Sequence, residues 1–176
     1  MEKSPVFDKN TVEFVTVAAQ YCSFLEQASD YDRRHLLDVL SKLLPLLYMK
    51  AAMLPETQVQ GLYLEEAVTE PQYDMIRQTV RMIMAGKDDY LEVFVDDMKY
   101  SDTPVNCFIS EGLADVYQAL GNFVQSYRSG LNEVMEEALA VCRDGFVTYW
   151  GQTLANTLRA VHAVAFGQDN SDETDD

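Results

Sequence analysis

The stretch that decides the fold is LNEVMEEALAVCRDGFVTYWGQTLANTLRAVHAVAF, residues 131–166. Apolar and small side chains recur in it at steps of three and four residues, which places them on one side of an α-helix. This stripe consists of Leu131, Met135, Ala138, Cys142, Phe146, Tyr149, Thr153, Thr157 and Val161, widened by Trp150, Leu154, Leu158 and Ala165. Charged and polar side chains mostly occupy the other side. Such a long stripe must be covered by other helices, so the stretch predicts a long C-terminal helix within a helical protein.

Five shorter helices are predicted before this stretch, and in four of them apolar residues recur at clear helical spacing. The five helices cover about residues 11–28, 30–53, 70–85, 88–96 and 111–128. Together with residues 131–166 they predict an all-α fold, an irregular helical bundle of about six helices around one core.

Capping signals mark several of the predicted helix ends. Asn10, Thr69 and Ser110 are typical N-cap residues that stand just before an apolar pattern. Gly86 is a typical residue for the end of a helix. Pro45 lies inside the second pattern, where a proline removes one backbone hydrogen bond and clashes with the preceding turn. We therefore expect the second helix to kink or break at this proline.

Two connecting segments do not follow a clear helical pattern. Residues 55–69 form a long connection, and we expect a helical turn around residues 64–68 within it. Residues 88–96 alternate like a strand over part of their length but also fit a helix. Because no second strand is evident to pair with them, a short helix is favoured, followed by a loop over residues 97–109.

The length and the end of the chain suggest its domain organisation. A chain of 176 residues is typical of one domain. We assign residues 1–166 to a single helical domain and residues 167–176 to an acidic tail. The tail has no apolar side chain to bury, so it is expected to be disordered.

The formal net charge of −16 results from 29 acidic and 13 basic residues. Nucleic acids and anionic membrane surfaces are poor candidate partners, because proteins bind both mainly through Lys and Arg. The charge fits a basic partner or a metal ion. Solubility alone also explains it, and this is the interpretation that we favour.

The sequence contains no signal for export or membrane insertion. The first residues lack the apolar core of a secretion signal, and no run of about 18 apolar residues is present. The three cysteines have no metal-binding spacing, which is typical of buried thiols in a reducing compartment. We therefore expect a cytoplasmic protein.

The patterns that might carry chemistry are incomplete. Asp32 and His35 share a helix face, as do Glu133 and Glu136, but neither pair has the further ligands of a di-iron or magnesium centre. No phosphate-binding glycine loop is present. We predict no cofactor, no metal and no catalytic residue. The expected function is therefore a non-catalytic binding or interaction protein, whose partner (a protein or a small molecule) and oligomeric state stay open. The alternative is a metal-dependent hydrolase that uses helix-borne carboxylates.

A cluster of aromatic, amide and basic residues provides the candidates for ligand binding, which are Asp115, Trp150, Asn156, Arg159 and His162. Arg159 and His162 share a helix face, and Asp115 on the preceding helix is a candidate partner for Arg159. The cluster fits a polar pocket for an anion. It also fits a buried indole beside an Arg–Asp pair that fixes the register of two helices, and this structural interpretation is favoured.

Several segments together resemble a known family. They are SEGLADVY at 110–117, YWGQ at 149–152, LRAVH at 158–162, LLPLLY at 43–48 and the run at 14–26. In these segments the chain is similar to an uncharacterised bacterial family of small acidic all-helical proteins, a domain of unknown function. The resemblance implies a helical fold over nearly the whole chain, but it implies no activity, cofactor or site residue.

Overall fold

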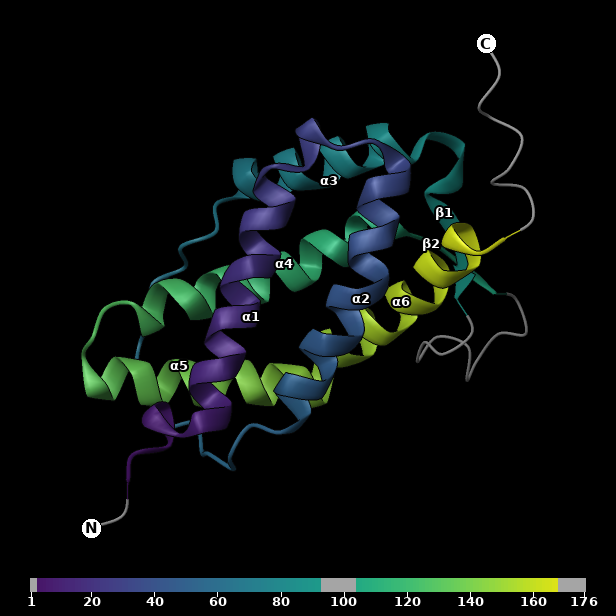
Figure 1. Ribbon diagram of the computed structural model, residues 1–176. Coiled ribbons are helices and arrows are strands. Elements are labelled where there is room, and N and C mark those ends of the chain that lie inside the picture. Colours follow the sequence, from purple (N-terminus) through teal and green to yellow (C-terminus); the bar gives the residue numbers. More distant parts are fainter. Residues whose placement is uncertain (1–2, 93–103, 168–176) are drawn as a thin grey trace.

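The computed structural model describes residues 3–92 and 104–167, which form six α-helices and one β-hairpin (Figure 1). The helices are α1 (Lys9–Glu26), α2 (Arg33–Ala52), α3 (Glu70–Met84), α4 (Ile109–Tyr127), α5 (Asn132–Gly145) and α6 (Gly151–Ala165). The strands are β1 (Asp89–Glu92) and β2 (Val105–Phe108). The predicted all-α class, with about six helices and a long C-terminal helix, is confirmed.

The helices pack around α4, which contacts α1, α3, α5 and α6. Figure 1 shows α1 and α2 side by side across the layer of α4, α5 and α6, with α3 along one end. Their apolar faces meet in one core cluster, in which the largest fully buried side chains include Phe14, Tyr21, Leu36, Leu40, Leu44, Leu113 and Trp150. No helix in the described part of the chain is long and apolar enough to cross a membrane.

The C-terminal helix is continuous from Asn132 to Ala165, but a π-helical turn at Phe146–Trp150 joins α5 to α6. In this turn the Gly151 amide donates to the carbonyl of Phe146, five residues earlier. The wider turn shifts the apolar stripe by one residue, so that it passes to Trp150. Tyr149, which the period of 3.6 residues placed on the stripe, is instead 57% exposed. Leu131 was also placed there, but it precedes the helix and is exposed.

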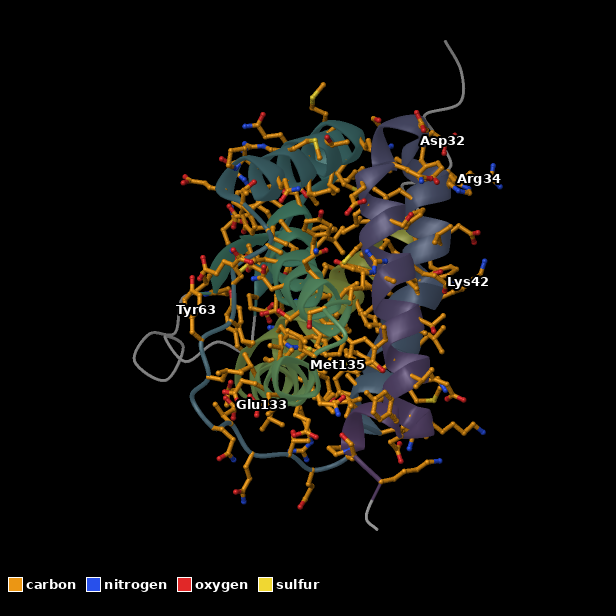
Figure 2. The ribbon with its side chains drawn as sticks, turned by 90° about the vertical axis from the view of Figure 1, so that its left-hand side faces the viewer. Asp32, Arg34, Lys42, Tyr63, Glu133 and Met135 are labelled. Atoms are coloured by element: carbon orange, nitrogen blue, oxygen red, sulfur yellow. The ribbon has the colours of Figure 1, made fainter. Side chains whose placement is uncertain are left out.

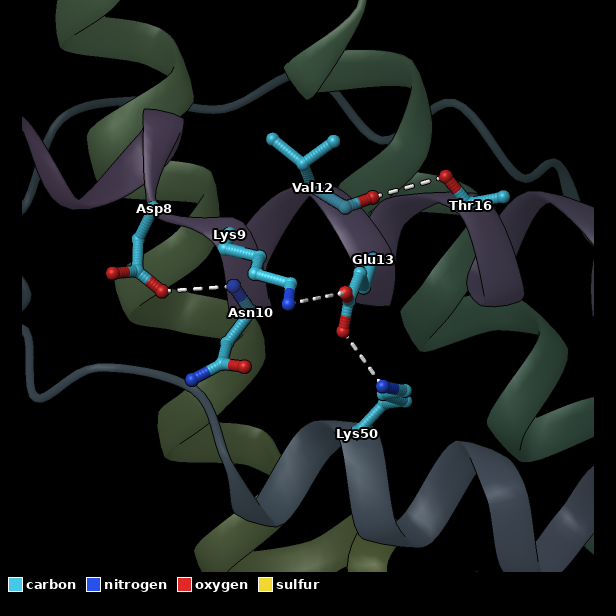
Figure 3. Close-up of polar contacts among 7 residues, drawn as sticks. All are labelled: Asp8, Lys9, Asn10, Val12, Glu13, Thr16 and Lys50. Atoms are coloured by element: carbon cyan, nitrogen blue, oxygen red, sulfur yellow. Dashed lines mark hydrogen bonds and ion pairs between the residues drawn. The ribbon is translucent and has the colours of Figure 1, made fainter.

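The first helix begins earlier than predicted, because Asp8 rather than Asn10 is its N-cap residue. The Asp8 carboxylate accepts a hydrogen bond from the Asn10 amide (2.9 Å), as Figure 3 shows. One turn later, Glu13 pairs with Lys50 of α2 (2.7 Å) and with Lys9 of its own helix (3.8 Å). The contact with Lys50 connects the second turn of α1 to the last turn of α2.

The second helix runs through Pro45 without a break. Pro45 is exposed, so the carbonyl that loses its helical donor lies toward solvent and not in the core. Asp32 is the N-cap residue of this helix and accepts from the His35 amide (2.8 Å). The pairing of Asp32 with His35 thus has a structural role.

The third helix begins as predicted and ends differently. Thr69 and Gln72 form a complete capping box. At the other end Ala85, not Gly86, has a positive φ of 50°. The helical turn predicted around residues 64–68 is absent, since that segment has no regular secondary structure.

The predicted short helix over residues 88–96 is wrong where the structure describes it. Residues 89–92 form β1, which pairs antiparallel with β2, and Tyr90 lies opposite Cys107. The strand partner was missed because residues 97–109 were interpreted as a loop. Residues 93–103 lie outside the described part of the chain, as do residues 168–176, on which most of the predicted acidic tail falls.

Asp88, the residue just before β1, caps the N-terminus of α4. Asp88 is 3% exposed, and its carboxylate accepts from both the amide (2.8 Å) and the hydroxyl (2.6 Å) of Ser110. Ser110 was predicted to be the cap itself, but it lies inside the helix, which begins at Ile109. A cap from outside the helix fixes the position of β1 relative to α4.

Candidate functional site

A pocket of about 410 Å³ lies between β1 and the last turns of α6. Its polar lining consists of Lys87, Asp89 and Arg159. Its apolar lining includes the ring of Tyr90 and the aliphatic side chains of Leu91, Ile109, Ala160, Ala163 and Val164. A concave site of this size, with apolar walls and a few polar groups, is the usual form of a small-molecule site.

Arg159 occupies a defined position at this pocket. Its Nη2 donates a hydrogen bond to the carbonyl oxygen of Leu91 (2.7 Å), and its guanidinium lies 5.9 Å from the centre of the Tyr90 ring. These two contacts connect α6 to β1. The predicted ion pair between Arg159 and Asp115 is therefore wrong. The guanidinium binds the backbone of β1 instead, and the sequence pattern does not show that β1 packs against α6.

Tyr90 presents a neutral ring to the pocket. Burial, followed by the nearby carboxylate of Glu92, raises the pKa of its hydroxyl above the usual value of 10.0. Glu92 itself is 1% exposed and lies on the same inner side of β1. The Tyr90 hydroxyl therefore stays protonated at neutral pH, so Tyr90 gives the pocket an aromatic face and no negative charge.

Asp115 belongs to a different cluster, between α3, α4 and the π-helical turn. Its two carboxylate oxygens accept hydrogen bonds from the hydroxyls of Tyr73 (2.6 Å) and Tyr149 (3.0 Å). Burial and the charge of Asp115 raise the pKa of Tyr149 to about 12. The carboxylate therefore holds three elements together and does not face Arg159.

Trp150 is a core residue with 1% exposure. Its indole Nε1 donates to the carbonyl of Cys142 (2.9 Å), and its ring stacks on Phe14 at a centroid distance of 6.3 Å. This contact satisfies the buried indole N–H and secures the π-helical turn to α5. The structural interpretation of Trp150 is thus the one that fits, and a ligand does not reach this ring.

The last two candidates also lie apart from the pocket. The Asn156 side chain accepts from Gln152 (2.7 Å), one turn earlier on α6. His162 is exposed, and its ring contacts Phe166 at 4.9 Å. Of the five predicted candidates, only Arg159 lines the pocket. Lys87 and Tyr90 had no signal in the sequence, because they reach the site only through the docking of the hairpin.

A second pocket, of about 690 Å³, lies between residues 56–62 and α5. Glu56, Glu133, Glu136 and Glu137 line it, and Figure 2 shows Glu133 on this side of the molecule, away from Asp32. Both Glu137 oxygens are engaged, since they accept from the amides of Gln60 and Gly61 (both 2.8 Å).

The pairs that the sequence suggested as partial metal sites have other contacts in the structure. Glu136 accepts a hydrogen bond from the hydroxyl of Ser4 (2.8 Å), and the ring of His35 lies 4.7 Å from that of Tyr31. Within residues 3–92 and 104–167, no three His, Cys, Asp or Glu side chains are grouped so that they could hold a metal ion.

The fold and sequence have known relatives. The family model described as "Domain of unknown function (DUF5063)" matches residues 5–167. The crystal structure of protein BF1032 from Bacteroides fragilis is similar over 93% of this chain and 96% of that chain, with 44% sequence identity and a TM-score of 0.84. No curated protein matches the chain significantly. These findings confirm the resemblance to an uncharacterised bacterial family.

Proposed function

The chain belongs to the DUF5063 family, and on the geometry of its pocket we propose that it is a non-catalytic binding protein that holds a small molecule between β1 and α6. The observation that carries this proposal is the pocket of about 410 Å³ with Arg159 at its edge. β1 and α6 supply most of its lining, with Lys87 before β1 and Ile109 of α4, and Arg159 joins α6 to β1 through the Leu91 carbonyl (2.7 Å). A pocket held in this way is largely formed before the ligand arrives, which lowers the entropic cost of binding.

The chemistry of the lining supports binding rather than catalysis. The lining residues include no histidine, cysteine or serine, the residue types that most often act as general base or nucleophile. The groups present are two cations, one carboxylate, one ring and aliphatic side chains. Such groups orient and hold a ligand.

The proposal is tested by filling the pocket. Ala163 lines it and is exposed, so Ala163→Trp blocks the cavity without entering the core. Ala52, exposed at the end of α2, provides the matched control Ala52→Trp. The probes are small aromatic and aliphatic carboxylates and their neutral amides, observed by ligand-detected NMR. We expect Ala163→Trp to weaken the binding of the best probe by at least about tenfold, or roughly 1.4 kcal/mol, and Ala52→Trp to leave it unchanged. Equal binding by both variants would contradict the proposal.

The alternative function, a metal-dependent hydrolase, would need the second pocket with its four glutamates, although Glu137 already accepts from two backbone amides and no three such side chains in the described part of the chain are grouped to hold a metal ion. Carboxylate oxygens are the ligands that magnesium and manganese prefer. Calorimetric titration with Mn²⁺, together with an assay for hydrolysis of nucleoside triphosphates, tests this alternative. Stoichiometric Mn²⁺ binding that Glu133→Gln abolishes, with hydrolysis that depends on the metal, would favour the hydrolase over the binding protein.

A further inference from the structure

We propose that the pocket between β1 and α6 takes a monoanionic carboxylate carried on a short apolar body. In this assignment Arg159 binds the carboxylate directly, and Lys87 is a second, weaker cationic contact. The assignment rests on the proposed function, since it names the ligand class of the same site.

Arg159 can accept such an anion because its position is already set. Among the described residues only Nη2 is engaged, in the hydrogen bond to the Leu91 carbonyl (2.7 Å), and a guanidinium carries five N–H donors in a planar fork. The Tyr90 ring lies beside the same guanidinium at 5.9 Å. The remaining donors are thus presented in a fixed plane, which suits the two oxygens of a carboxylate.

Lys87 adds a second positive charge to the same lining. It follows α3 in a short helical turn, Ala85–Lys87, and has no hydrogen-bond or ion-pair partner among the described residues. An ammonium on a flexible stem acts as a point charge and adapts to the ligand. The two cations therefore have different roles: Arg159 orients the anion, and Lys87 adds attraction.

The charge balance of the lining favours a single negative charge on the ligand. The chain as a whole has 29 acidic and 13 basic residues, yet this pocket has two cations and one carboxylate, that of Asp89. A monocarboxylate neutralises the one excess positive charge of the lining. A phosphate dianion carries more negative charge than the lining can neutralise, and the overall charge of −16 repels it. A cationic ligand is disfavoured, because the lining has one carboxylate and two cations.

The walls of the pocket require an apolar body on the ligand. Leu91 of β1 (58% exposed) and Ala163 and Val164 of α6 expose apolar surface to the pocket, and the buried Ile109 and Ala160 complete its lining. Small aliphatic side chains offer no hydrogen bond, so a polar group placed against them would lose its hydration without compensation. A short alkyl chain or a single ring gains by burial there.

The test compares matched probes on the full chain. The probes are benzoate, phenylacetate and hexanoate, the primary amide of each, and phenyl phosphate as the dianion, measured by NMR titration at low ionic strength. We expect at least one carboxylate to bind at least about tenfold more tightly than its amide, and phenyl phosphate to bind no more tightly than benzoate. Arg159→Gln should remove the preference for the carboxylate and leave the affinity for the amide within about twofold. Lys87→Gln should reduce the preference severalfold, and Arg128→Gln, away from the pocket, should not change it.

The outcomes separate this inference from the proposed function. If the amides bind as tightly as the carboxylates, and Ala163→Trp still blocks them, the carboxylate assignment is wrong and the binding function stands. Tighter binding of phenyl phosphate than of benzoate would also overturn the assignment. If no probe binds, both proposals fail. Circular dichroism checks that Arg159→Gln is folded; if it is not, the effect of Lys87→Gln on the carboxylate preference decides, and an unchanged preference overturns the assignment.

Discussion

At the scale of single residues, Trp150 connects three parts of the core. It stacks on Phe14 of α1, contacts Phe146 at 4.9 Å and donates to the Cys142 carbonyl. Trp150→Ala is expected to lower the free energy of unfolding by about 3–5 kcal/mol, because it leaves a cavity and removes the hydrogen bond from the indole to the Cys142 carbonyl. Trp150→Phe keeps a ring and should cost less. Chemical denaturation measures both, and a cost below about 1 kcal/mol for the alanine variant would mean that Trp150 is not an anchor of the core.

The ion pair between Glu13 and Lys50 predicts a measurable pKa shift. The hydrogen bond from Lys50 lowers the pKa of Glu13 below its usual value of 4.5. A carboxyl whose pKa is depressed on folding stabilises the protein above the unfolded pKa, and this contribution is lost as the pH falls through the folded value. Lys50→Met should therefore raise the pKa of Glu13, as followed by NMR titration of its carboxyl carbon. Lys42→Met is the control, since Lys42 pairs with Asp38 instead; an equal rise in both variants would exclude the specific pair.

The same scale shows how far the candidate site could be predicted. Arg159 was a candidate because a cation on a helix near an apolar face attracts anions, and it does line the pocket. Its partner could not be predicted, because Leu91 contributes a backbone carbonyl that carries no signature in the sequence. Asp115 was paired with Arg159 from the order of the helices. Two tyrosine hydroxyls from other elements bind it instead.

At the scale of elements, the contact between α4 and α6 depends on Gly112. A methyl group at this position would overlap the hydroxyl of Thr157, which is fully buried. The higher helix propensity of alanine adds about 1 kcal/mol to the free energy of unfolding, but overpacking against Thr157 lowers it by roughly 1–3 kcal/mol. We therefore expect Gly112→Ala to destabilise the protein. The control Gly86→Ala meets no atom within 4 Å and should be near neutral.

A double-mutant cycle isolates the contact between Gly112 and Thr157. With Thr157→Ala in the background, the hydroxyl is removed and Gly112→Ala should cost less than in the wild type. The coupling is read from chemical denaturation of the four proteins. Simple additivity of the two single changes would show that this contact does not set the distance between the helices.

The elements also differ in how well the sequence predicts them. The long terminal helix and the Thr69 capping box follow from patterns within one segment, and both are present. The β1–β2 pair depends on a partner 13 or more residues away, so the pattern of either strand alone is ambiguous. The π-helical turn at Phe146–Trp150 changes the period locally, and a search at 3.6 residues per turn therefore assigned Tyr149 to the wrong face.

At the scale of the whole molecule, the helices share one core, and the sequence after Gly167 has no apolar side chain to add to it. Residues 168–176 contain no apolar side chain. Truncation after Gly167 is expected to leave the melting temperature nearly unchanged. A drop of more than about 4 °C, corresponding to roughly 1 kcal/mol or more in a domain of this size, would mean that this segment contributes to the fold.

The ligand proposed for this bundle is a small carboxylate, bound in the pocket between the hairpin and the last helix. The most direct measurement is the mapping of backbone amide shifts in the full chain during titration with the tightest-binding carboxylate of the probe set. We expect the largest saturable shifts around the pocket, at Lys87, Tyr90, Leu91, Arg159 and Ala163. Shifts centred instead on Gln60, Gly61 and Glu136, at the acidic pocket, or no saturable shifts at all, would contradict this proposal.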